Sequence, residues 1–477
     1  MRDFMKDLLP IWPETFLLSA VVVSLISAFY VPPSRARTRA DKCIYTGLLA
    51  AFAAMCLIKV PDQGLSIETP SFVLDKFAVW VKKLFLLGAI ISLLFGADWL
   101  KYKKYSRFEF ATLIGFSVTG MMLTVSAGTF LMQFLGLEMM HFPLLFLTAY
   151  KRKGERSTEA GTKYAVVMFL SSGLYLFGVS VIYACLGTMD FSKISAADKN
   201  EIMPALLWGV SFITAGLLLK IGAAPFHSWV ADVYEGAPSP VTALFAMIVR
   251  LGVIAAFARI VLEPFGTLTF YWRPVLMIVG LLSIGIGSFG AMVQDSIKRL
   301  TAYTAIVLNG FVLSALVLGN APLLLTFLTS DLILSAGMTA VVLSLRVGDE
   351  LIEKIRVLAG QGQAKPVRGA LFSLIFLGLS GAPPFAGFWA RFRLFKEMTQ
   401  QGFPFFAMML MVGGLLIMYV YFRLIRRMYT TSAKEELSFA PAPMKAVIIL
   451  SAFLSVFFFA VMGALDGIFQ TAFLSSG

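Results

Sequence analysis

Residues 220–250 read KIGAAPFHSWVADVYEGAPSPVTALFAMIVR, and this stretch decides the fold. Lys220 ends one apolar run and is followed by a break that carries His227. A polar turn then leads into a second apolar run, which starts at Pro240 and holds Arg250 near its centre. Ionisable groups at membrane depth are costly and usually mark an ion path. Since a helix broken at that depth usually lines a polar cavity, the stretch predicts a polar path inside a membrane protein.

The composition supports a membrane class for the whole chain. Of its 477 residues, 58% are hydrophobic and 14% are charged, whereas a soluble domain carries about 25% charged residues. The mean hydropathy is +0.83. The net charge of +13 would suggest nucleic acid in a soluble chain, but here the basic residues lie in loops. We therefore expect an all-α polytopic membrane protein with no nucleic-acid partner.

Apolar runs of about 20 residues predict roughly fourteen transmembrane helices, two of them interrupted. The predicted spans cover residues 12–30, 44–60, 78–97, 108–126, 128–149, 163–186, 204–222 with a continuation to 235, 239–261, 272–292, 301–318, 321–345, 369–384 with a continuation to 400, 403–428 and 442–466.

Loop charge gives an orientation for these spans. Basic residues collect in the loops after odd-numbered spans, at 35–42, 101–107, 151–156, 298–299, 346–368 and 423–434. The positive-inside rule puts such loops on one side of the membrane, so both termini should lie on the other side. Acidic residues and prolines before the first apolar run make a poor signal or transit peptide, which favours a bacterial or organelle-encoded protein.

The chain is interrupted twice in a similar way. The segment SGAPPFAGFWARF, residues 380–392, resembles the break after Lys220, because each has small residues, proline, phenylalanine and a nearby cation. Paired breaks predict two inverted five-helix repeats, by analogy with inverted-repeat transporters. The predicted organisation is a three-helix segment at 1–100, repeats at 101–262 and 263–430, and a C-terminal helix at 431–477.

Three residues are candidates for proton transfer. Glu138 lies well inside the fifth span, where a carboxylate needs a partner, and Lys220 is the natural one. A Lys–Glu pair whose separation changes can switch proton affinity. His227 lies in the break and could relay protons or simply cap it. The alternative for Glu138 is a structural ion pair that only locks two helices. The alternative for Lys220 is a lysine whose side chain reaches the membrane interface.

Further charged residues extend this set to a predicted polar axis. Arg250 and Arg391 stay protonated, so they can hold or tune a carboxylate but cannot easily release a proton. Asp331 needs a partner at its depth, and either arginine could supply it. His141 lies one helical turn after Glu138 and could relay protons or pack in the interior. Glu14 fits a helix cap better than a site.

Metal and redox sites are not expected in this chain. Three cysteines, Cys43, Cys56 and Cys185, show no metal-binding spacing, and two histidines cannot build a metal site alone. We expect no disulfide, metal, haem or flavin.

Several motifs resemble the antiporter-like N subunit of respiratory complex I, the proton-pumping NADH:quinone oxidoreductase, called NADH dehydrogenase subunit 2 in mitochondria. The segment KIGAAPFHSWVADVYEGAPSPVTALFA is similar to the family signature, and DVYEGAPSPVTA favours the N type. LGLEMM, KRLTAYTAI and SGAPPFAGFWARF are similar to three other family segments, so the resemblance covers most of positions 130–395.

The resemblance implies a fourteen-helix fold with two inverted repeats and a proton channel. It implies that Glu138, Lys220 and His227 match the family's functional positions. It also implies no cofactor in this chain, with flavin, iron–sulfur clusters and quinone in other subunits. The implied partners are other membrane-arm subunits, including another antiporter-like subunit and small membrane subunits, and lipids. The implied location is the bacterial or mitochondrial inner membrane, with both termini on the periplasmic or intermembrane-space side.

The sequence departs from the family at four places. The family has lysines where this chain has Arg250 and Arg391, and a polar residue near Val307 or Leu308. The position of Asp331 is usually uncharged. Two alternatives therefore stay open: a structural membrane-arm subunit with impaired pumping, and a cation/proton antiporter or hydrogenase-linked relative.

Overall fold

The computed structural model describes residues 9–30, 33–58, 60, 65–66, 71–102, 108–151, 154–199, 202–348, 350–432, 437–438, 441–460 and 462–463. Helices dominate this part of the chain. Eleven of the described helices are long and apolar enough to cross a membrane, and three shorter apolar helices take the places of predicted spans four, twelve and fourteen. The all-α polytopic class is confirmed.

The chain forms two compact units, and each is made of more than one segment of the sequence. The first unit holds the described parts of residues 1–221 and 248–272, and the second holds those of residues 222–247 and 273–470. The predicted repeats at 101–262 and 263–430 are segments related by internal symmetry. A division into compact units does not test such symmetry, so the repeats stay a prediction.

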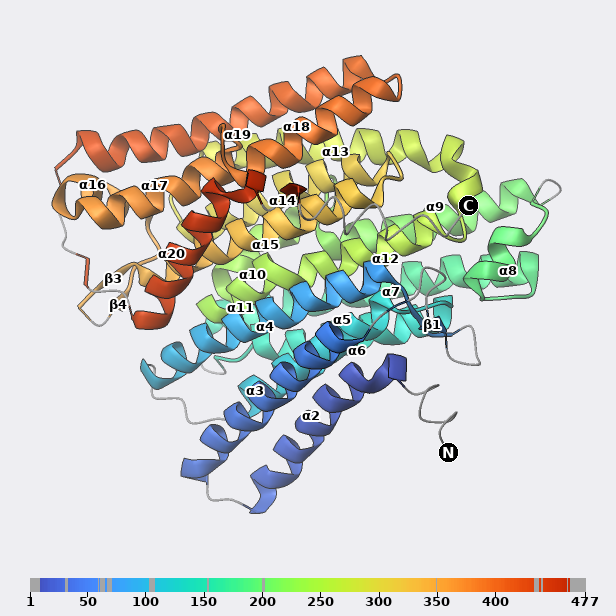
Figure 1. Ribbon diagram of the computed structural model, residues 1–477, viewed down its shortest axis with the longest axis horizontal. Helices are drawn as coiled ribbons and strands as arrows, with labels where there is room; N and C mark the ends of the chain where they lie inside the picture. Colours follow the sequence, from blue (N-terminus) through green and yellow to red (C-terminus); the bar gives the residue numbers. More distant parts are fainter. Residues whose placement is uncertain are drawn as a thin grey trace. The chain divides into compact units, whose positions relative to one another are not determined.

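In the first unit, apolar helices pack against one another along their lengths. Figure 1 shows α2 and α3 side by side, and α5 packs on α6, α7 on α9, and α12 on both α5 and α9. Its helices and strands are α2 (Trp12–Tyr30), α3 (Pro33–Leu57), β1 (Leu65–Ser66), β2 (Val73–Leu74), α4 (Lys76–Tyr102), α5 (Glu109–Val125), α6 (Phe130–Thr148), α7 (Glu155–Leu186), α8 (Phe191–Ala196), α9 (Met203–Ile221) and α12 (Arg250–Leu262), with short 3-10 helices at Leu9–Ile11 and Gly266–Leu268.

The second unit is built around α15, which packs against α14, α18 and α20, while α19 covers α17 and α18. Its elements are α10 (Ser228–Gly236), α11 (Ser239–Leu244), α13 (Thr269–Met292, its first turn in the first unit), α14 (Ile297–Leu316), α15 (Ala321–Ser344), β3 (Arg346–Val347), β4 (Glu350–Leu351), a 3-10 helix (Ile355–Leu358), α16 (Gln361–Ala364), α17 (Pro366–Ser380), α18 (Ala386–Gln400), α19 (Pro404–Thr430) and α20 (Ala442–Val456); a π-helical segment, Phe245–Val249, joins α11 to α12.

Two predicted span starts are wrong by two helical turns or more. Helix α3 starts eleven residues before the predicted 44, and α7 starts eight residues before the predicted 163. Apolar runs mark only the uncharged part of a helix. These helices also continue through polar residues whose side chains find hydrogen-bond partners. Arg37, for example, donates to Ala97 O at 2.7 Å. The end of the last predicted span, residues 464–466, and the loop residues Lys103, Lys104, Arg107, Arg152, Lys153 and Lys434 lie outside the described residues.

Both predicted helix breaks are confirmed. Helix α9 ends at Ile221, and Gly222 then takes a φ of 66°. Helix α17 ends at Ser380, and Gly381 takes a φ of 79°. This left-handed conformation is rare for residues with a Cβ, so glycine stops each helix at a defined residue. A cis X-Pro bond follows each glycine, at Ala224–Pro225 and Pro383–Pro384, before α10 and α18 begin.

Candidate functional site

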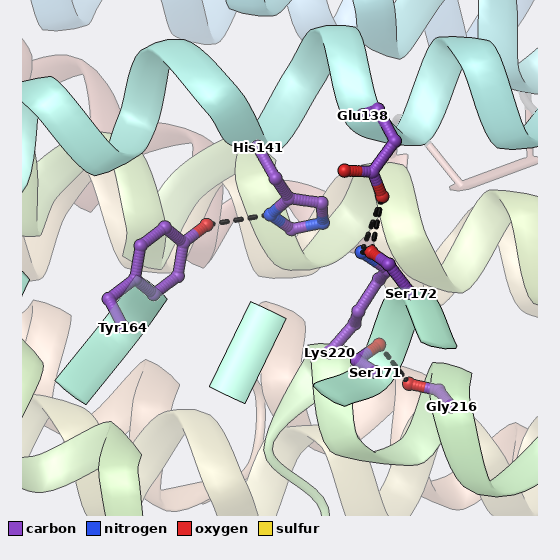
Figure 2. Close-up of polar contacts among 7 residues, drawn as sticks. All are labelled: Glu138, His141, Tyr164, Ser171, Ser172, Gly216 and Lys220. Carbon is purple, nitrogen blue, oxygen red and sulfur yellow. Dashed lines mark hydrogen bonds and ion pairs between the residues drawn. The ribbon is translucent and has the colours of Figure 1, made fainter. Parts of the chain in front are cut away.

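A polar cluster lies among the apolar helices of the first unit (Figure 2). It joins Glu138 of α6, Ser172 of α7 and Lys220 of α9. The Lys220 Nζ atom lies 3.3 Å from Glu138 Oε1 and donates to Ser172 Oγ at 3.0 Å. The Ser172 hydroxyl donates to the same Glu138 oxygen. The ammonium, hydroxyl and carboxylate therefore form a closed triangle of hydrogen bonds.

The two charges of this cluster differ in their access to the surroundings. The Lys220 side chain is 1% exposed, whereas the Glu138 side chain is 31% exposed on the surface of this chain. Removing one partner of a buried ion pair leaves an uncompensated charge and is costly. The lysine is therefore held by the carboxylate, and the carboxylate remains open to other charges.

Close packing of α7 on α9 positions the cluster. An added Cβ at Gly178 would lie 2.5 Å from Gly209 O, so only glycine permits this approach. About two helical turns from this close approach, Ser171 Oγ of α7 donates to Gly216 O of α9 at 2.7 Å and fixes the register of the two helices. Ser172, the next residue, thereby reaches Lys220 near the C-terminal end of α9, where a cation suits the helix dipole.

His141 extends the cluster along α6. It follows Glu138 by one turn, and Figure 2 shows its ring on the same side of the helix. Its Nδ1 atom lies 2.6 Å from the hydroxyl of Tyr164 in α7, and both side chains are buried. His141 thus lies beside Glu138, as predicted, and its contact with Tyr164 is a second polar contact between α6 and α7.

The break in the second unit holds its cation differently. Arg391, near the start of α18, donates to Ser380 O at 2.6 Å and to Leu379 O at 2.9 Å. Its guanidinium lies 4.5 Å from the centre of the Phe311 ring. These carbonyls are the last of α17, which carry the negative end of its dipole. Arg391 therefore caps the half-helix with a charge that neighbouring neutral groups stabilise.

The structure places the remaining predicted residues as follows. Arg250 is buried at the start of α12, directly after the π-helical segment. Asp331 is buried in α15 and accepts a hydrogen bond from Ser335 at 3.1 Å. His227 immediately precedes α10, and its Nδ1 atom is buried without a hydrogen-bond partner among the described residues. The pairing predicted for Asp331 stays a prediction.

The sequence did not reveal the neutral residues that contact the charged ones, nor the lysine that pairs with Glu14. Ser172 and Tyr164 are hydroxyl residues within an apolar run, and only the helix register shows that they face the charged residues. Lys82 was also missed. It pairs with Glu14 at 2.5 Å, with side chains 0% and 4% exposed. Glu14 lies in the first turn of α2, as a cap would, but its carboxylate also ties α2 to α4.

A charged cluster near the end of α12 was missed as well. Arg259 pairs with Asp75 at 2.9 Å and with Glu263 one turn later. Asp75 also accepts the backbone N–H of Ala78 at the start of α4. The cluster thus links α4 to α12 within the first unit, and the long sequence separation of its members hides it from motif analysis.

The broken helices and buried charges define an antiporter-type membrane protein, and comparison with known proteins agrees. Residues 127–417, more than half of the chain, match the family described as NADH:quinone oxidoreductase/Mrp antiporter, TM. NADH-quinone oxidoreductase subunit N of Rhodospirillum rubrum is 35% identical over 471 residues, covering 96% of this chain and 95% of the relative. The subunit N of Granulibacter bethesdensis is 36% identical over 451 residues, covering 92% and 94%. The chain belongs to the NADH-quinone oxidoreductase subunit N family.

Solved structures share the fold. A chain of respiratory complex I from Thermus thermophilus matches with a TM-score of 0.81 and 26% identity, covering 95% of this chain and 99% of that chain. A chain of the Mrp complex from Dietzia sp. matches with a TM-score of 0.80 at 18% identity, covering 99% and 98%. The second likeness concerns the fold alone.

Proposed function

We propose that this chain is a proton-translocating membrane-arm subunit of respiratory complex I. In this role it couples NADH:quinone oxidoreduction, carried out in other subunits, to proton movement across the membrane. The observation that carries the proposal is the buried Lys220 ammonium, which is held by a single, partly accessible carboxylate and a hydroxyl. Family membership supports the same assignment.

The geometry supplies a way to load and unload one proton. While Glu138 is ionised and close, it stabilises the Lys220 ammonium in a site from which water is largely excluded. If charge from outside the chain draws the Glu138 carboxylate away or neutralises it, the buried ammonium loses its compensation and its proton becomes easier to release. Ser172 can then accept a hydrogen bond from Lys220 or donate one to the free amine.

The arginines serve this mechanism as fixed charges. Arginine does not release its proton under ordinary conditions. Arg391 is held by two carbonyls, and Arg250 is buried in the first turn of α12. We infer that they set the electrostatic potential along the path, while Glu138, Lys220, His227 and Asp331 are the groups that can change protonation.

The setting follows from the same proposal. We propose that the chain lies in a bacterial or mitochondrial inner membrane with both termini on the periplasmic or intermembrane-space side. Its partners would be other membrane-arm subunits, including another antiporter-like subunit, small membrane subunits and lipids. Flavin, iron–sulfur clusters and quinone would belong to other subunits.

Proton pumping per NADH oxidised, measured in reconstituted vesicles, tests the proposal. Lys220→Ala should lower pumping and coupled turnover while the complex still assembles. Lys82→Ala is the matched control, because it removes a buried lysine from another Lys–Glu pair of the same unit. Normal pumping by an assembled Lys220→Ala complex would contradict the proposal.

A structural membrane-arm role is the second candidate. The observation that favours it is Arg391, whose carbonyl partners cannot exchange protons with it. In that case Lys220→Ala and Lys82→Ala would both reduce assembly, and neither would change the number of protons pumped by the complexes that form.

A further inference from the structure

One buried contact beside the Lys220 site is not used by the mechanism above. Tyr164 and His141 join α7 to α6 through a 2.6 Å contact between hydroxyl and Nδ1. Tyr164 is 0% exposed and His141 is 2% exposed. Figure 2 shows the imidazole between the tyrosine on one side and the Glu138–Lys220 pair on the other.

The second imidazole nitrogen points to a function. His141 Nε2 is buried and has no hydrogen-bond partner among the described residues. Buried polar groups of this kind are usually satisfied by an ordered water. A ring with tyrosine at one nitrogen and a water at the other can accept a proton on one side and release one on the other.

We propose that Tyr164 and His141 form a proton branch that joins the Glu138–Lys220 pair to the membrane face where α6 ends and α7 begins. This inference rests on the proposed function of that pair. In one passage the Tyr164 hydroxyl gives its proton to Nδ1, and Nε2 gives its proton through a water to the deprotonated pair. Water on the loop side then reprotonates Tyr164. One proton enters and one leaves, and the imidazole stays neutral with its remaining proton on Nδ1. A turn of the ring then brings Nδ1 to the side of the pair, so the next passage loads Nε2 and unloads Nδ1, which restores the starting tautomer.

The path toward that face carries further buried hydroxyls. Thr148 ends α6 and Ser157 lies in the first turn of α7, and both are buried. Ser157 Oγ donates to Thr148 O at 2.7 Å, which holds the two helix ends together. Thr148 lies seven residues beyond His141, about 10 Å along the helix. Each hydroxyl keeps lone pairs that can accept a hydrogen bond from water.

The test compares single-atom changes on one helix in the reconstituted complex. Tyr164→Phe removes the hydroxyl and keeps the ring. Tyr175→Phe is the matched control, because Tyr175 is also buried in α7 and its hydroxyl donates to Gln133 at 2.8 Å, outside the branch. We expect Tyr164→Phe to slow proton pumping several-fold while NADH oxidation with an artificial acceptor is unchanged, and we expect Tyr175→Phe to pump normally.

A second variant separates a relay from a packing role. His141→Gln can keep a hydrogen bond to Tyr164, but an amide does not pass protons. A branch predicts that His141→Gln pumps as slowly as Tyr164→Phe, with a reduced solvent isotope effect on the pumping that remains. Normal pumping by His141→Gln, or equal effects of Tyr164→Phe and Tyr175→Phe, would overturn the branch. The proposed function fails separately, if Lys220→Ala pumps normally.

Discussion

The two broken helices look alike in the chain but hold their cations in different ways. At the first break, Lys220 faces a carboxylate and a hydroxyl contributed by α6 and α7. At the second, Arg391 turns back onto the carbonyls that end its own broken helix. The first cation depends on a group that can titrate, and the second depends on groups that cannot. Similar backbone breaks thus support one switchable charge and one fixed charge.

This difference explains why arginine is suited to the second break. A planar guanidinium can satisfy two carbonyls at once and also stack on Phe311, which an ammonium cannot do as well. The carbonyls are neutral and cannot take up the proton, so the guanidinium keeps its charge at this site. Lysine, by contrast, suits the first break, because its charge can be lost when the carboxylate is disturbed.

The largest expected effect on stability comes from Gly381→Ala. A Cβ there would lie 2.2 Å from Arg391 Nη1, and the φ of 79° disfavours alanine by about 1–2 kcal/mol. Because two carbonyls hold the guanidinium in place, overpacking should add about 1–3 kcal/mol. Thermal denaturation of the purified complex would measure the loss.

The control for this change is Gly402→Ala. Gly402 has a φ of 88°, and nothing lies within 4 Å of an added Cβ. Gly402→Ala should therefore lower the stability only by the cost of alanine in a left-handed backbone conformation. Equal losses for the two variants would mean that Arg391 is not fixed at the break.

An intermediate effect is expected at the first break from Ser172→Ala. The change removes hydrogen bonds to both charges of the pair, and because Lys220 and Glu138 keep their contact with each other, the net loss should be about 1.5–3 kcal/mol. Pumping rate should fall together with stability. Ser171→Ala removes only a bond to Gly216 O, so it should cost about 0.5–1.5 kcal/mol and lower pumping per complex less than Ser172→Ala does. Parallel pumping assays of the two neighbouring variants would detect the difference.

The smallest effect is expected from Arg391→Lys. A lysine keeps the positive charge at the end of α17 but loses part of the contact with the carbonyls and Phe311, a cost of about 1 kcal/mol. Protons pumped per NADH should not change, since the account needs only a fixed charge here. A marked rise in pumping after this substitution would show that Arg391 limits proton transfer.

Hydropathy and breaker residues were enough to predict the class, the fourteen apolar segments and both breaks. Long apolar runs and the Gly–Pro clusters carry those signals directly. The early starts of α3 and α7 could not be predicted, because both helices continue past the apolar zone without an apolar pattern. The division into two compact units also depends on contacts between segments far apart in sequence.

At the site, the charged residues were visible in the sequence and their partners were not. Glu138 and Lys220 stand out as charges in apolar runs, and the structure confirms that they meet. Ser172 and Tyr164 are ordinary in composition, and only the packing of α7 brings them to the site. The Glu14–Lys82 pair was hidden because Lys82 lies near the start of its helix, where a lysine reads as an interface residue.

The most direct test of the account is the number of protons pumped per NADH by a Lys220→Arg complex in vesicles. This variant keeps the positive charge and the contact with Glu138 but replaces a releasable proton with a fixed one. The account predicts an assembled complex with reduced pumping, whereas Arg391→Lys pumps normally. Full pumping by Lys220→Arg would contradict it, because the cation at the first break would then act only through its charge.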